Sequence, residues 1–166
     1  MRAARLGLLV ASAVACAHVS PDTPAPSDFW QALALQPVQT TGPVVLRGHV
    51  TVVSFFATWC FPCIALVPRL MQLQEAHARE GLQVVGIGMD LEGGAVLEPF
   101  VEHYALNFPV FYPSPEMRLG KSAFGAIPEL PLTVVLGRRG ELLTAYGGML
   151  EVGGLEKLIQ QALKAK

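Results

Sequence analysis

VTVVSFFATWCFPC, residues 50–63, is the stretch that decides the fold of this chain. Its first part, Thr51 to Ala57, is rich in β-branched and aromatic residues and has the length of a buried strand. Its last part is a Cys-x-x-Cys motif, which such a strand would pass directly to the start of a helix. The stretch therefore predicts a central strand followed by a redox-active cysteine pair at a helix N-terminus.

The two cysteines are expected to have different roles. Cys60 would lie at the helix N-terminus, where unpaired backbone N–H groups and the helix dipole favour a thiolate. Cys63 lies one turn further along the helix, close enough to form a short disulfide with Cys60. We therefore expect Cys60 to be the nucleophile and Cys63 the resolving thiol.

Two other interpretations of the pair are weaker. A structural zinc site would need two further ligands, and the sequence has no second Cys pair and no closely spaced His pair. A static disulfide across two residues closes so small a loop that it would constrain the unfolded chain little. The four histidines are scattered, and we assign no chemistry to them.

The residues on either side of this stretch predict helices and strands in alternation. An amphipathic helix is expected over Phe61–Arg79, with Pro68 inside it and Gly81 ending it. A tight loop at residues 137–140 predicts a hairpin. The other expected elements are a helical turn within Phe29–Leu35, a short strand at Val44–Leu46, a strand at Gln83–Met89, a helix at Ala95–Tyr104, a strand or extended loop at Phe108–Tyr112, strands at Leu132–Leu136 and Glu141–Tyr146, and a helix at Val152–Ala165.

Length and composition favour one compact domain. The chain has 166 residues, of which 52% are hydrophobic, and we expect a single folded domain over residues 29–166. The formal net charge is −1 and no long basic run is present, so we do not expect a nucleic-acid partner.

Residues 1–15 have the layout of an export signal. Arg2 and Arg5 precede an apolar stretch and then small residues. The apolar stretch has about half of the roughly 20 residues that a membrane-spanning helix needs, so cleavage is expected. The mature protein would then act outside the cytoplasm.

The residues after this signal predict membrane attachment. The sequence from Ala13 to Cys16 resembles a bacterial lipoprotein cleavage box, in which Cys16 is lipidated, although an ordinary Ala-x-Ala cleavage fits equally. Residues 16–28 are rich in proline and small polar residues and are expected to form an extended tether. We expect the domain to lie on the periplasmic side of a bacterial membrane.

Several separated motifs resemble the thioredoxin fold, and more closely the TlpA/ResA-like thiol–disulfide oxidoreductases. The resemblance covers about residues 44–163, and its motifs are FFATWCFPC at 55–63 with Pro68 after it, NFPV at 107–110, and LPLT at 130–133 followed by a strand and Gly140. It implies an α/β fold in which a central mixed sheet is flanked by helices. We expect no cofactor and no metal.

The resemblance also assigns a substrate surface. It implies a cis proline at Pro131, preferred over Pro128 because Pro131 immediately precedes an apolar strand. The backbone of Leu130 would then be free to pair with an extended substrate. Trp59, Phe61 and Pro62 are expected to line the contact surface around Cys60.

Two positions depart from the family pattern. Thioredoxins carry an aspartate where this chain has Ser54, and ResA-like proteins often carry a glutamate where it has Leu66. Such a carboxylate could accept the proton of the resolving thiol. Without it, three alternatives remain for the Cys63 proton: slower deprotonation, a water relay through Ser54, or Glu129 as the substitute acceptor.

The expected function is reduction of disulfides in exported proteins, for example in apocytochrome c or at a copper-site thiol pair, with a membrane electron donor of thiol type. The direction of exchange depends on the reduction potential, which the Phe-Pro dipeptide does not determine. A Cu(I) metallochaperone using the same cysteines and a non-catalytic adaptor are the alternatives. A peroxidase is disfavoured because Thr58 lies two residues before Cys60, where the peroxiredoxin pattern has threonine three residues before its cysteine.

Overall fold

The computed structural model describes residues 35–39, 44–45, 47–149 and 152–165. The expected export signal, Cys16, the tether over residues 16–28 and, apart from Leu35, the helical turn at Phe29–Leu35 lie outside these residues.

The expected strand and helix around the cysteines are present. Strand β2, Val50–Phe56, is buried along its whole length, and helix α2, Phe61–His77, follows it after a short turn. The helix continues through Pro68 and passes into a 3₁₀ turn, η1, at Ala78–Glu80. Gly81 then ends it with a φ of 93°, a left-handed conformation that favours glycine.

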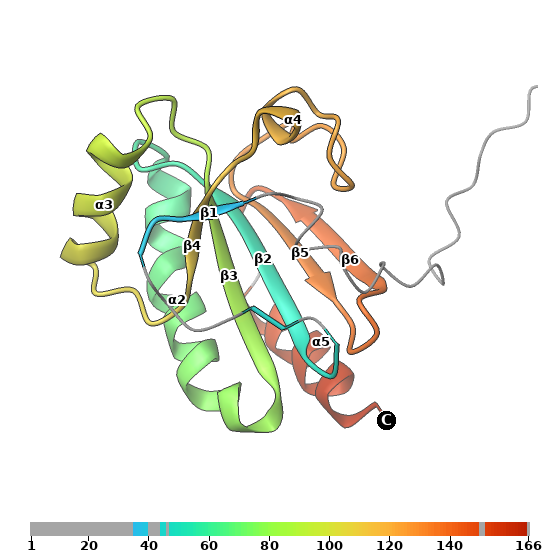
Figure 1. The fold of residues 1–166 in the computed structure, drawn as a ribbon. Helices are drawn as coiled ribbons and strands as arrows, with labels where there is room; N and C mark the ends of the chain where they lie inside the picture. Colours follow the sequence, from blue (N-terminus) through green and yellow to red (C-terminus); the bar gives the residue numbers. More distant parts are fainter. Residues whose placement is uncertain (1–34, 40–43, 46, 150–151, 166) are drawn as a thin grey trace, which may run out of the picture.

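The sheet is mixed and has six described strands in the order β1-β4-β3-β2-β5-β6 (Figure 1). β3 (Leu82–Gly88) and β4 (Val110–Tyr112) run parallel to β2. β5 (Leu132–Leu136) is antiparallel to β2, and β6 (Leu142–Gly147) forms the expected hairpin with β5. The central mixed sheet flanked by helices is therefore confirmed.

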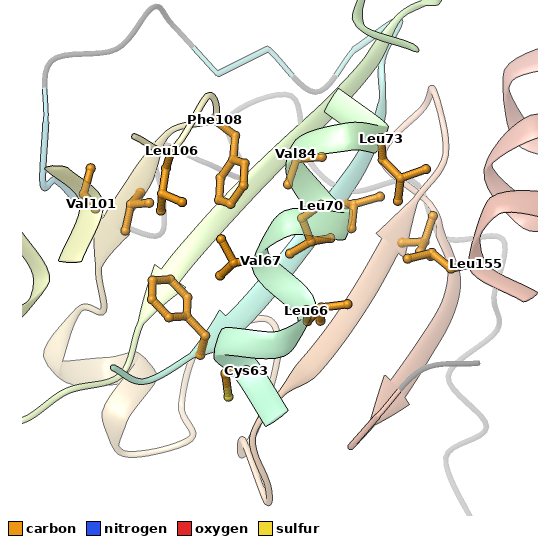
Figure 2. Close-up of a cluster of buried hydrophobic side chains, with 14 of the residues drawn as sticks. Cys63, Leu66, Val67, Leu70, Leu73, Val84, Val101, Leu106, Phe108 and Leu155 are labelled. Carbon is orange, nitrogen blue, oxygen red and sulfur yellow. The ribbon is translucent and has the colours of Figure 1, made fainter. Parts of the chain in front are cut away.

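Side chains alternate between the two faces of β2, as expected for a strand. Val52 and Phe56 pack in the larger core cluster with residues of α2, α3 (Gly94–His103) and α5 (Val152–Lys164). Figure 2 shows this cluster, with Cys63 at the start of α2 and leucine and valine side chains following it along the helix. Val53 and Phe55 point to the opposite face, where Met117 of α4 (Pro115–Arg118) packs on them.

One expected strand is wrong and two elements were not expected. Val44 and Val45 are not in a strand, and Leu46 lies outside the described residues. The N–H of Val45 donates to the side chain of Gln83 (3.1 Å), so this segment meets the sheet through a side chain. The strand that does form is β1, Gln36–Pro37, which pairs with the edge of β4, a position where proline is tolerated. The short helix α4 is the other addition.

The hydroxyl of Tyr112 in β4 donates to Glu98 of α3 (3.0 Å) and connects this helix to the sheet. Desolvation by burial, together with the hydrogen bond and the negative charge of Glu98, raises the pKa of Tyr112.

Candidate active site

Cys60 and Cys63 form a disulfide at the first turn of α2, with their α-carbons 5.2 Å apart. Cys60 is the N-cap residue of the helix, and its Sγ accepts a hydrogen bond from the backbone N–H of Cys63 (3.3 Å). Pro62 occupies the first turn, where its missing N–H costs nothing. Both cysteines are buried, at 5% and 2% exposure. This arrangement would stabilise a thiolate on Cys60 after reduction, through the N–H groups and the dipole of α2.

The residues around the cysteines divide into exposed and buried groups. Trp59 and Phe61 are 72% and 80% exposed, so neither is a core residue. Pro62, in the first turn of α2, is half-buried. Two large exposed aromatic side chains therefore flank Cys60 in the sequence.

The peptide bond between Leu130 and Pro131 is cis, as the sequence predicted for Pro131. Pro131 is buried, and its carbonyl accepts the N–H of Gly148 (2.8 Å). Leu130 packs against the core cluster that contains Cys60 and Cys63. Within the part of the chain that the structure describes, the backbone N–H and C=O of Leu130 have no hydrogen-bond partner.

The two positions that lack a family carboxylate are both buried. Ser54 is 2% exposed and lies on the α2 face of β2, and Leu66 of α2 is 8% exposed. Ser54 pairs in register with Thr133 of β5, whose buried hydroxyl has no hydrogen-bond partner among the described residues. Glu129 is exposed, and its carboxylate lies against Gly147 of β6, outside the core beneath Cys63.

Sequence reasoning missed one residue of the site, Asp90, which lies two residues after the end of β3. Asp90 is fully buried, and its carboxylate accepts hydrogen bonds from the backbone N–H of Thr58 (3.0 and 3.1 Å) and from the Thr58 hydroxyl (2.6 Å). Thr58 lies two residues before Cys60, and Asp90 lies 32 residues after Thr58. An aspartate at the end of an apolar strand was the available signal, but many such residues are solvated.

Over the described ranges, no group of three or more His, Cys, Asp or Glu residues could hold a metal ion. In the same ranges, no helix has the length and apolar character needed to cross a membrane.

Comparisons with known proteins agree with this geometry. The thiol-disulfide oxidoreductase ResA of Oceanobacillus iheyensis is 30% identical over 112 residues, which is 67% of this chain and 56% of that protein. The chain therefore spans little more than half the length of this curated relative. A putative thiol:disulfide interchange protein DsbE from Chlorobium tepidum has a similar structure, with a TM-score of 0.61 and 27% identity over 70% of this chain and 81% of that chain.

A putative thioredoxin from Neisseria meningitidis shares the fold, with a TM-score of 0.66 and 24% identity over 73% of this chain and 79% of that chain. The thioredoxin-like fold that the sequence motifs implied is thus confirmed. Residues 21–160, which include the cysteine pair, Asp90 and the cis proline, match the AhpC/TSA family. With its disulfide at the N-terminus of α2 and a cis proline before β5, the chain belongs to the AhpC/TSA family of thioredoxin-like proteins.

Proposed function

We propose that this protein is an extracytoplasmic thiol–disulfide oxidoreductase that reduces disulfides of exported proteins. The observation that carries the proposal is the Cys60–Cys63 disulfide at the N-cap of α2, beside two exposed aromatic side chains. The printed name of the Oceanobacillus relative, thiol-disulfide oxidoreductase, supports the same reaction class.

The reaction begins with the reduced protein. The Cys60 thiolate attacks one sulfur of a substrate disulfide, the substrate S–S bond breaks, and a mixed disulfide forms while the first substrate thiolate leaves and takes up a proton. Cys63 then loses its proton and attacks Sγ of Cys60. The mixed disulfide breaks, the second substrate thiolate is released and protonated, and the Cys60–Cys63 disulfide forms. Two electrons pass to the substrate, and a thiol-type membrane donor restores the dithiol.

The surroundings of the pair suit an extended protein substrate. The free N–H and C=O of Leu130 can pair with the backbone on one side of a substrate cysteine, in the manner of an added strand. Trp59 and Phe61 supply apolar contact area next to Cys60. We also assign Pro62, in the first turn of α2, and the cis proline Pro131 to the substrate site.

We place the protein on the periplasmic side of a bacterial membrane, held by a lipid on Cys16 and the tether at residues 16–28. The sequence of residues 1–16 supports this placement. The role we propose there is reduction of the disulfide of apocytochrome c, or of the disulfide form of a copper-site thiol pair. Stoichiometric Cu(I) binding by Cys60 and Cys63 without disulfide reduction would favour the metallochaperone alternative.

The reduction potential of the Cys60–Cys63 pair tests the direction of exchange. We expect a value near that of thioredoxin, about −270 mV, which would make the protein a reductase. Equilibration with glutathione and dithiothreitol buffers, followed through Trp59 fluorescence, measures it. A value near about −120 mV, as in DsbA, would identify an oxidant and contradict the proposed direction.

Cys63→Ser is expected to trap the mixed disulfide between Cys60 and the substrate. The resolving attack must then come from a thiol in solution in place of one in the same helical turn, so release should slow by about 100-fold or more. Non-reducing electrophoresis and mass spectrometry of the trapped species measure the effect. Release of the product at the rate of the unmodified protein would exclude Cys63 as the resolving thiol.

A further inference from the structure

Asp90 is a buried acidic residue whose carboxylate has no cationic partner among the described residues. It is fully buried, and in the described part of the chain its carboxylate is bonded only to the N–H and hydroxyl of Thr58. Both of these groups are donors, which suits an ionised carboxylate because it can only accept. Burying a carboxylate is costly unless it is paired or hydrogen-bonded, so this residue calls for an explanation beyond packing.

The Asp90 carboxylate holds the turn that leads into Cys60. The N–H of Cys60 donates to the carbonyl of Ala57 (3.1 Å), which closes a turn with Thr58 and Trp59 at its two central positions. Asp90 accepts both hydrogen-bond donors of Thr58, and Trp59 projects into solvent. The α-carbons of Thr58 and Cys60 are at most about 7 Å apart, because Trp59 alone separates them. The buried carboxylate is therefore held against the turn that ends at the nucleophilic residue.

A cation contacts the backbone at Asp90. Arg118 of α4 donates Nη2–H to the backbone carbonyl of Asp90 (2.7 Å) and Nη1–H to that of Met89 (3.1 Å). Its guanidinium contacts the backbone of the Asp90 segment, whereas the carboxylate itself points to Thr58. Arg118 is exposed, so solvent screens its charge more than that of Asp90.

We propose that Asp90 is a positioning residue whose buried negative charge, held against the Thr58 turn, disfavours the Cys60 thiolate and so makes the cysteine pair more reducing. This inference rests on the proposed function and explains why the exchange would run in the direction of substrate reduction. The helix N-terminus favours the thiolate, and the thiolate belongs to the reduced form. A nearby negative charge opposes that effect, shifts the equilibrium toward the disulfide, and lowers the reduction potential.

Asp90→Asn tests the proposal, because asparagine keeps an oxygen that can accept from Thr58 and removes the charge. We expect the equilibrium constant with glutathione to shift about tenfold toward the reduced protein. For a two-electron couple this is a rise of about 30 mV in the reduction potential. The pH midpoint of Cys60 alkylation by iodoacetamide should fall by about one unit, because one pKa unit is also a tenfold change in an equilibrium constant. The thermal midpoint of unfolding is measured alongside as a record of structural damage.

Glu141→Gln is the matched control. Glu141 is mostly buried and accepts a backbone N–H, that of Arg139 (2.9 Å), but it lies in the β5–β6 loop at the opposite end of the sheet from the cysteines. This variant also loses one negative charge, and we expect its potential and alkylation midpoint to equal those of the unmodified protein.

Arg118→Gln supplies a test of opposite sign on a surface residue, in case Asp90→Asn does not fold. Loss of the cation should favour the disulfide, by a smaller factor of about twofold because the guanidinium is exposed. The proposal is overturned if Asp90→Asn lowers only the thermal midpoint, or if Arg118→Gln raises the potential. Failure of the unmodified protein to reduce any protein disulfide would instead overturn the proposed function, since the potential and the alkylation profile belong to the cysteine pair alone.

Discussion

Cys60→Ser is expected to reduce the rate of insulin disulfide reduction by about 10³-fold or more. The loss should be this large because the thiolate is the attacking group, and removal of a nucleophile leaves only the background reaction. The assay follows the turbidity of reduced insulin with the full chain and dithiothreitol as donor. The proposed reaction depends most directly on this loss of activity in Cys60→Ser.

Cys16→Ser is the matched control for this experiment. It makes the same chemical change at the cysteine that we place in the lipid anchor, and the rate in solution should stay at that of the unmodified chain. A Cys60→Ser protein that is as active as the Cys16→Ser protein would favour a non-catalytic adaptor and contradict the proposed reaction.

Phe55→Ala is expected to lower the free energy of unfolding by about 3–5 kcal/mol, through lost burial and the cavity that remains. Phe55 is fully buried in β2, and its ring meets that of Phe124 edge to face at a centroid distance of 5.1 Å. The loss is a large part of the roughly 5–15 kcal/mol that stabilises a typical domain. Equilibrium unfolding in urea measures it.

Phe61→Ala makes the same substitution at an exposed position of the site. Because Phe61 is 80% exposed, its loss should change stability by no more than about 0.5 kcal/mol. The KM for protein disulfides should rise, since the side chain supplies contact area to the substrate. Equal destabilisation by the two variants would show that Phe61 is a core residue in solution, and would remove it from the proposed substrate surface.

Local sequence patterns determined the types of most elements and placed the cysteine pair at the junction of a strand and a helix. The apolar run at Val50–Phe56 and the helical spacing after Cys60 specify β2 and α2, because the period of burial differs between a strand and a helix. The cysteine pair could be placed in the same way, because it directly follows an apolar strand, whereas the cis bond before Pro131 was implied by the family resemblance.

Only the tertiary structure decided which distant segments meet. The strand expected at Val44–Leu46 does not form at its described residues, and the two-residue β1 forms because the edge of β4 is available to pair with it. Likewise, no local pattern connects Asp90 to Thr58, which lies 32 residues earlier. Their contact arises because β2 and β3 are parallel neighbours and end at the same edge of the sheet. Element type follows from the periodicity of a short stretch, whereas contacts between strand ends depend on the order and register of the whole sheet.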